Sequence, residues 1–199
     1  MVYRRTGPGP SAAYHRRMDR GRRLATAAGA ALWLAAPPAR AQWTWWLRPP
    51  RDWAEVDREL AARFDDVPVV DDAGLAAELA GPRAPLLLDA RTPAEWTVSR
   101  LPGARPAFDD AGAAAALAAA PASTPVVVYC SIGLRSARLA RRLRAQGRPA
   151  RNLHHGIFGW ADAGRPLVDD RGPATLVHPF DAGWGRLLSG PRRAPLETR

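Results

Sequence analysis

The chain has 199 residues, with 29 basic side chains against 19 acidic ones, and its formal net charge is +10. Most of that excess lies in residues 1–41, which carry eight arginines and one aspartate. The remainder is close to charge balance, which argues against the broad basic surface of a nucleic-acid-binding protein. A single cysteine excludes an internal disulfide, and the adjacent His154 and His155 have no third ligand at the spacing of a metal site. We predict no nucleic-acid partner, no metal and no cofactor.

Residues 1–41 have the order of a secretory signal peptide. A basic region ending in Arg22-Arg23 precedes the apolar stretch 24–36 and an Ala-Arg-Ala motif at 39–41. The stretch is shorter than the roughly 20 residues that a membrane span needs. We expect cleavage after Ala41, export to the periplasm, and no stable membrane span after cleavage. The sequence is compatible with a translation start at Met1 or at Met18. It is also compatible with export by the general or by the twin-arginine route.

Residues 42–66 form an aromatic N-terminal segment followed by a helix. The three tryptophans of 42–51 are expected to cover an apolar flank of the domain, and a membrane-interface role is the alternative. Asp52 is a predicted N-cap for a helix over 53–64. Helical spacing places one apolar stripe on this helix: Trp53, Val56, Leu60 and Phe64.

From residue 67 on, short apolar runs alternate with helical patterns. Thr92 and Glu95 have capping-box spacing around Pro93, which predicts a short helix there. We predict strands at 67–70, 86–88, after 104, at 126–129 and at 151–153, and helices at 72–79, 93–96, 110–120, 137–146 and 158–163. This alternation predicts an α/β fold with a mostly parallel central sheet and helices on both faces.

Residues 171–199 form a C-terminal tail. Trp184 and Leu187-Leu188 are expected to anchor this tail on the domain, and its end, rich in proline and arginine, is expected to be loose.

Cys130 lies between a buried strand and a helix whose predicted N-cap is Ser136. A thiol at this place faces unpaired backbone amides and the positive end of the helix dipole, and both favour the thiolate. The alternative is an inert buried thiol, which is the usual state of a lone cysteine. The neighbouring Gly133 and Arg135 favour a reactive nucleophile.

Three motifs in order resemble the rhodanese-like domain family. They are the segment 89–96 followed by the Leu-Pro-Gly-Ala turn 101–104, the loop 130–136, and the segment 152–167. Together they cover a predicted rhodanese-like domain at 67–170. The sequence departs from the family pattern at Arg100, where the family often has histidine, and at His155, which replaces one of two glycines.

The resemblance implies a single-domain sulfurtransferase. Cys130 would take a sulfane sulfur from a small anionic donor such as thiosulfate, carry it as a persulfide, and pass it to cyanide or a thiol. The implied substrate-binding residues are those of the loop: Ser131, Ile132, Gly133, Leu134, Arg135 and Ser136. Arg135 would clamp an oxyanion, or instead form an inward salt bridge to Asp89 or Glu95. Asp89 and Arg91 are interpreted as a supporting buried network, and Glu95 as a helix cap.

Other function classes remain as alternatives. The loop is one residue shorter than in the phosphatases that resemble this family, which disfavours a phosphatase or arsenate reductase. A thiol redox protein lacks its resolving cysteine here. The main alternative is a non-catalytic binding or sulfur-relay module that docks a periplasmic protein partner. His154 and His155 are assigned surface or packing roles rather than metal binding.

Overall fold

The computed structural model describes residues 48–196. The predicted signal peptide and the three tryptophans of 42–51 lie outside the described residues. The helices are α1 (Trp53–Phe64), α2 (Asp72–Leu79), α3 (Pro93–Val98), α4 (Asp110–Ala118), α5 (Leu134–Ala145) and α6 (Gly156–Asp162). The strands are β1 (Val69–Val70), β2 (Leu86–Asp89), β3 (Arg105–Pro106), β4 (Val126–Tyr129), β5 (Ala150–Leu153), β6 (Leu167–Val168) and β7 (Pro173–Ala174).

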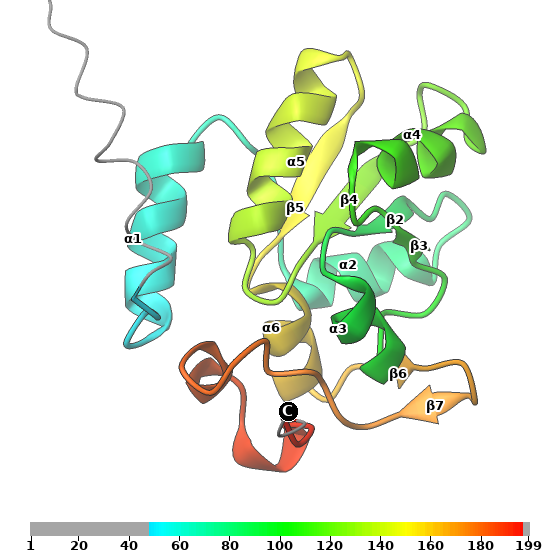
Figure 1. The fold of residues 1–199 in the computed structure, drawn as a ribbon. Coiled ribbons are helices and arrows are strands. Elements are labelled where there is room, and N and C mark those ends of the chain that lie inside the picture. The colour runs from blue at the N-terminus through cyan, green and yellow to red at the C-terminus, as the bar shows by residue number, and fades with distance from the viewer. Residues whose placement is uncertain (1–47, 197–199) are drawn as a thin grey trace, which may run out of the picture. The chain divides into compact units, whose positions relative to one another are not determined.

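The central sheet has five parallel strands in the order β1-β5-β4-β2-β3, and β6 pairs with β7 in a small antiparallel sheet (Figure 1). Successive residues of β4 face opposite sides. Val126 and Val128 share a core cluster with α4 and α5, whereas Val127 and Tyr129 share one with α2 and α6. Both faces of the sheet are therefore covered, which explains the continuous apolar run of β4. The predicted α/β class is confirmed.

Helix α1 spans the predicted residues and packs against α5. The Asp52 side chain accepts a hydrogen bond from Glu55 N at 2.8 Å, which confirms the predicted N-cap. Val56 and Leu60 are buried, and Trp53 and Phe64 pack against the same cluster. Within residues 48–196, no helix combines the length and the apolar character needed to cross a bilayer.

The start of α5 differs from the prediction. Ser136 was expected to be the N-cap, but α5 begins at Leu134 and its N-cap is Gly133, whose φ is 100°. A glycine adopts this left-handed conformation without strain, so the chain enters the helix directly after the cysteine loop. Ser136 consequently lies in the first turn, where its hydroxyl donates to Asn152 Oδ1 at 2.6 Å instead of capping the helix.

The C-terminal tail is part of the core rather than an appendage. Trp184, Leu187 and Leu188 are buried in the same cluster as α6, as the sequence predicted for these anchors. The end of the tail is not loose within the described residues, because Ala194 N donates to Val177 O at 2.9 Å. The tail, orange to red in Figure 1, loops round beside α6 until Arg193 forms a parallel bridge with Val177.

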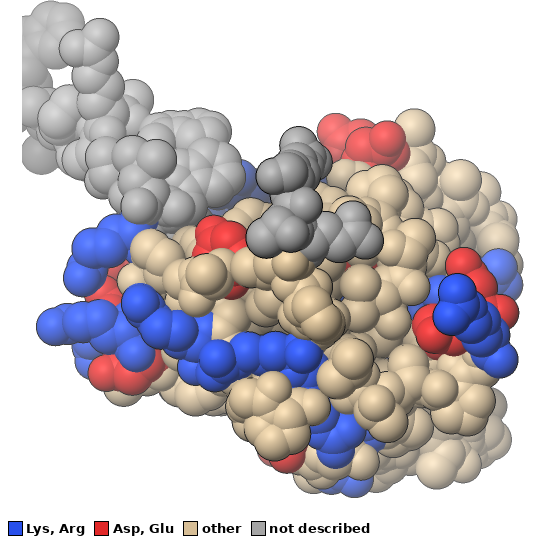
Figure 2. All heavy atoms as spheres, turned by 60° about the horizontal axis from the view of Figure 1, so that its bottom comes forward, with Lys and Arg blue, Asp and Glu red and all other residues tan. Residues whose placement is uncertain are grey.

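On the face drawn in Figure 2, basic side chains follow one another from the left edge to the middle of the view, with carboxylates beside them mainly at the left. A separate group of basic and acidic side chains lies on the right, beyond uncharged surface.

Replacing Leu188, whose side chain is fully buried, tests whether the tail stabilises the domain. Leu188→Ala should lower the free energy of unfolding by about 3 kcal/mol, because it removes buried methyl groups and leaves a cavity. Leu196→Ala is the matched control on the same tail, since Leu196 is 40% exposed. It should change the free energy by no more than about 0.5 kcal/mol in denaturant unfolding. Equal effects of the two substitutions would show that the tail does not belong to the folded core.

Candidate active site

Cys130 lies at the carboxyl end of β4, in the loop that leads into α5. Its side chain is only 1% exposed. Gly133 N donates a hydrogen bond to Cys130 Sγ at 3.2 Å, and the positive φ of Gly133 turns this amide toward the sulfur. The loop therefore curls around the sulfur atom and directs backbone N–H toward it.

The first residues of α6 hold the same loop from its other side. Ile157 N donates to Cys130 O at 2.9 Å, and Phe158 N donates to Ser131 O at 3.1 Å. A Cβ atom added to Gly156 would lie 2.2 Å from Cys130 O, so a side chain at this position cannot fit without moving the backbone. This close approach explains why the closing motif keeps a glycine there.

Ser136 and Asn152 connect the cysteine to β5. Ser136 Oγ lies 3.4 Å from Cys130 Sγ, and its hydroxyl donates to Asn152 Oδ1. All three side chains are buried. Asn152 Nδ2 has no hydrogen-bond partner among the described residues, although it is buried. No role was predicted for Asn152. The only sequence feature that could have pointed to a role is its position in the third motif.

Backbone amides at the start of α5 are available to an anion. The first helical bond of α5 runs from Ala137 N to Gly133 O at 3.0 Å, so the preceding first-turn amides have no partner within the helix. The Ile132 and Leu134 side chains are buried in the core cluster. A ligand of the loop would therefore meet the backbone of these two residues and not their side chains.

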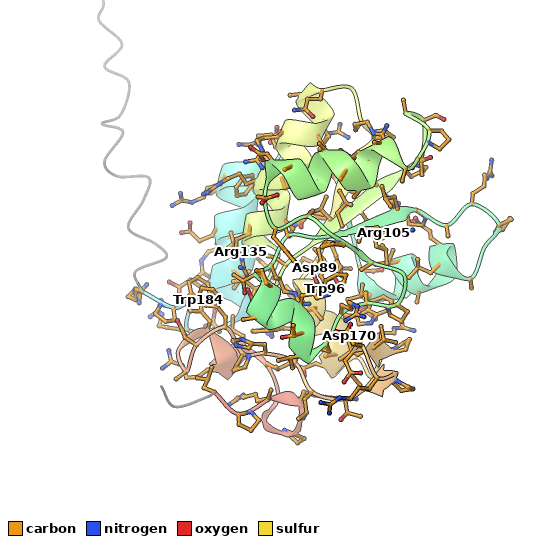
Figure 3. All side chains as sticks on the ribbon, turned by 45° about the vertical axis from the view of Figure 1, so that its right-hand side comes forward. Asp89, Trp96, Arg105, Arg135, Asp170 and Trp184 are labelled. Atoms are coloured by element: carbon orange, nitrogen blue, oxygen red, sulfur yellow. The ribbon has the colours of Figure 1, made fainter. Side chains whose placement is uncertain are left out.

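Glu95 and Arg135 form a two-pronged ion pair across the site (Figure 3 labels Arg135). Arg135 Nη1 and Nη2 donate to the two oxygens of Glu95 at 2.9 and 2.7 Å. The Ser131 hydroxyl donates to Glu95 Oε1 at 2.5 Å, and Arg135 Nη2 also donates to Ser131 Oγ at 2.9 Å. Of the two readings of Arg135, the inward salt bridge is present, and its partner is Glu95 rather than Asp89.

Glu95 also caps α3, as predicted. Its Oε2 accepts hydrogen bonds from Thr92 N at 3.0 Å and from the Thr92 hydroxyl at 2.9 Å. Burial alone would raise the pKa of Glu95, but the hydrogen bonds and charge of Arg135 outweigh it and lower the pKa to about 2. In turn, burial opposes the charge of Arg135, while Glu95 and then Cys130 raise its pKa. The pair is ionised at neutral pH.

Asp89 and Arg91 form a second, fully buried ion pair at the end of β2 (Figure 3 labels Asp89). Arg91 Nε and Nη2 donate to the Asp89 carboxylate at 2.9 and 2.6 Å, and Nη2 also donates to Ser99 O at 2.6 Å. Burial and the Asp89 carboxylate raise the pKa of Tyr129 well above its usual value, so its phenol stays protonated. The Tyr129 oxygen accepts from Leu101 N at 3.2 Å. The network links the ends of β2 and β4 to the turn after α3.

Phe180 belongs to the tail, yet it lies at this site. Its ring is 5.0 Å from the Arg135 guanidinium carbon, a cation–π distance, and its φ of 69° is unusual for a residue with a side chain. The Phe180 side chain is 42% exposed. Sequence reasoning missed this residue, because nothing in a tail motif signals a contact with a loop 45 residues earlier.

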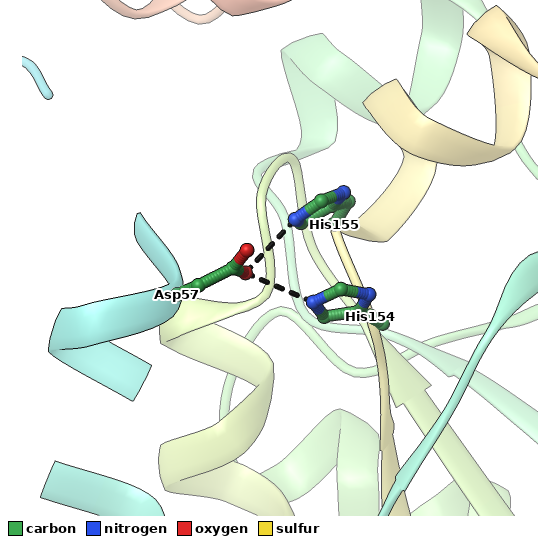
Figure 4. Close-up of side chains that lie close together, drawn as sticks. All are labelled: Asp57, His154 and His155. Carbon is green, nitrogen blue, oxygen red and sulfur yellow. Dashed lines mark hydrogen bonds and ion pairs between the residues drawn. The ribbon is translucent and has the colours of Figure 1, made fainter. Parts of the chain in front are cut away.

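A second polar cluster lies where β5 ends. His154 Nε2 and His155 Nε2 are each 2.9 Å from Asp57 Oδ1 (Figure 4). The sequence offered no third polar group near the two histidines, and the fold supplies one from α1. His155 also stacks on Trp53, with ring centroids 4.0 Å apart, so a packing role for this ring is present.

Acid unfolding tests the Glu95–Arg135 pair. The folded pKa of about 2 lies below the reference value of 4.5, so the ionised carboxylate stabilises the fold above pH 4.5, and this contribution is lost as pH falls toward 2. Glu95→Gln should lower the free energy of unfolding by about 3 kcal/mol at pH 7. At pH 3 this reduction should be smaller by about 2 kcal/mol. Denaturant unfolding of both proteins between pH 7 and 3 measures the difference.

Glu78→Gln is the control, because Glu78 forms a more exposed two-pronged pair with Arg151. Its cost at pH 7 should stay below about 1 kcal/mol. A Glu95→Gln difference that does not change between pH 7 and 3 would contradict the assignment of this carboxylate.

A family model and a relative of known sequence indicate the family of this chain. Residues 72–163 match the rhodanese-like domain model. A protein named sulfurtransferase from Allochromatium vinosum is 34% identical over 104 residues, which are 52% of this chain and 96% of that protein. A thiosulfate sulfurtransferase structure from Pseudomonas aeruginosa gives a TM-score of 0.50 at 24% identity, over 62% of this chain and 23% of that one. A rhodanese-like domain protein from Staphylococcus aureus gives 0.46 at 23%, over 52% and 99%. The motifs, the parallel sheet and the Allochromatium relative together place this chain in the rhodanese-like family.

Proposed function

We propose that this chain is an exported sulfurtransferase in which Cys130 carries a sulfane sulfur as a persulfide. The observation that carries the proposal is the surrounding of Cys130 Sγ: Gly133 N donates to it at 3.2 Å, and Ser136 Oγ lies 3.4 Å from it. The Arg135 guanidinium interacts electrostatically with the same cysteine. The name of the Allochromatium relative supports the reaction class. We propose thiosulfate as the donor and cyanide or a thiol as the acceptor.

The proposed reaction has two steps. The Cys130 thiolate attacks the outer sulfur of thiosulfate, a sulfur–sulfur bond to the enzyme forms, and the bond inside thiosulfate breaks to release sulfite with its electron pair. The acceptor then attacks the terminal sulfur of the persulfide, so cyanide leaves as thiocyanate and the Cys130 thiolate returns. Splitting the transfer in this way replaces one difficult step by two easier ones.

The loop supplies the electrostatics that this chemistry needs. Both the attacking group and the donor are anionic, and the persulfide keeps a negative charge. The unpaired first-turn amides of α5 and the Gly133 amide stabilise that charge without reorganising. Asn152 Nδ2, buried and unpartnered in the part of the chain described, is a further donor on a side chain that is linked to the loop through Ser136.

Arg135 has two roles in this proposal. Its ion pair with Glu95 holds the loop, and its 31% exposed side chain presents positive charge to an arriving oxyanion. The Phe180 ring of the tail lies beside the same guanidinium. The buried Asp89–Arg91 pair lies at the end of the neighbouring strand β2 and supports the loop from there. It is not proposed to touch substrate.

The proposals on location and cofactors rest on the sequence alone. We propose that residues 1–41 direct the chain to the periplasm and are removed, and that neither metal nor organic cofactor takes part in sulfur transfer. The alternative function, a binding or relay module, has no separate observation in its favour.

Thiocyanate release from thiosulfate and cyanide tests the reaction. Cys130→Ser should lower the rate by at least about 1,000-fold, because removing a covalent nucleophile removes the whole pathway. A Cys130→Ser protein that retains the activity of the unmodified chain would refute the proposed nucleophile. An unmodified chain without activity would favour the relay module.

Replacing Arg135 separates donor binding from loop support. Arg135→Ala should raise KM for thiosulfate about tenfold or more and also lower kcat, since an unpaired Glu95 repels the donor. Arg142→Ala is the control, because Arg142 lies on the same helix and pairs with Asp110 on the exposed surface. It should leave both constants unchanged. Steady-state kinetics at varied thiosulfate concentration measures both constants. A KM that is equal in the two variants would contradict a role for Arg135 in donor binding.

A further inference from the structure

Asp57, His154 and His155 come from two separate parts of the chain to one point. Both Nε2 atoms lie 2.9 Å from the same oxygen, Asp57 Oδ1, and the ligand atoms of the three residues all lie within 4.8 Å of one another. Asp57 belongs to α1, which precedes the 72–163 segment of the family match, whereas both histidines lie inside it. The cluster is therefore made by the packing of α1 on the domain.

The backbone at His155 is arranged so that two consecutive imidazoles face the same side. Neighbouring residues of an extended strand point in opposite directions. The φ of His155 is 55°, in the left-handed region that glycine adopts freely and other residues adopt rarely. This turn brings the His155 ring onto the His154 ring, with centroids 3.8 Å apart (Figure 4). An imidazole thus occupies a position suited to glycine, and its nitrogen converges with that of its neighbour.

One carboxylate oxygen is a poor final partner for two imidazoles. Each neutral ring can place one N–H on Asp57 Oδ1, and the two N–H dipoles then repel each other across a short distance. A divalent cation satisfies all three groups at once, since each ring can hold its proton on Nδ1 and present a lone pair at Nε2.

The surroundings leave room for further ligands. Asp57 and His154 line a groove of about 250 Å³ between α1 and the β1–β5 edge. Trp53 stacks on His155 at 4.0 Å and fixes the plane of that ring. Three protein ligands beside an accessible groove are the arrangement of a metal site with open positions for water or substrate.

We propose that Asp57, His154 and His155 form a binding site for a divalent transition-metal ion, of which Zn²⁺ suits two imidazoles and one carboxylate. The site is distinct from the proposed sulfur-transfer centre. It adjoins that centre through α6, because His155 is the N-cap of the helix whose first amides donate to Cys130 O and Ser131 O.

Zinc titration by calorimetry tests the site in the Cys130→Ser background, where no thiolate can bind the metal. This parent should bind one equivalent of Zn²⁺ in the micromolar range or tighter. Asp57→Asn and His155→Gly should each weaken binding by about 100-fold, because each removes a ligand, and losing even a ligand's outer partner costs about 10- to 100-fold. Glycine also adopts the left-handed φ of position 155 without strain, which offsets the loss of the ring contacts with Trp53 in this variant.

His178→Ala is the matched control, since His178 is a histidine of the tail outside the cluster. It should keep the zinc affinity of the parent. Thermal unfolding with and without Zn²⁺ gives a second readout: the metal should raise Tm of the parent and of His178→Ala, and should not raise Tm of Asp57→Asn. Absence of saturable binding by the parent, or equal affinities of Asp57→Asn, His155→Gly and His178→Ala, would overturn the proposal.

Discussion

The two-pronged ion pair between Glu95 and Arg135 joins segments that are far apart in the sequence, and the geometry of the cysteine loop depends on it. One carboxylate receives the Thr92 cap of α3, the Ser131 hydroxyl of the loop and the guanidinium of α5. Because Glu95 is buried, losing the Arg135 guanidinium would leave its charge without an ionic partner. The carboxylate that caps α3 is therefore the same group that holds the cysteine loop in place.

A second constraint is the close packing of backbone segments around Cys130. Gly133 turns the chain into α5, and Gly156 lets α6 reach the carbonyl groups of the loop. These contacts fix the direction of the loop amides before any ligand arrives. A preorganised set of donors stabilises an anion more strongly than flexible groups do, because nothing has to be reordered during the reaction. The buried Asp89–Arg91 pair supports this arrangement from the neighbouring strand.

Much of the fold could be predicted from local signals in the sequence. The Asp52 cap, the Thr92–Glu95 capping box and the apolar run of β4 each act within a few residues, and the structure has all three. The predicted start of α5 was wrong because Gly133, and not Ser136, is the N-cap. Gly133 adopts a left-handed conformation there and lies close to Asn152 and Leu153 of β5.

Long-range partners could not be predicted in the same way. Glu95 was predicted to be a helix cap. That Arg135 pairs with Glu95 and not with Asp89 depends on how α3 packs beside the loop. Phe180 and Asp57 reach their contacts only through the docking of the tail and of α1. Residues that meet across such distances leave no periodic pattern in the sequence, so their roles emerge from the tertiary structure.

The central claim is that Cys130 itself carries the transferred sulfur. The most direct measurement is the intact mass of the purified chain after exposure to thiosulfate, beside Cys130→Ser treated identically, with peptide mapping of the added mass. Sulfur transfer through Cys130 predicts a gain of one sulfur atom on the peptide that contains Cys130, absent from Cys130→Ser and removed by cyanide as thiocyanate. An unchanged mass in both proteins, or an equal gain in both, would contradict it.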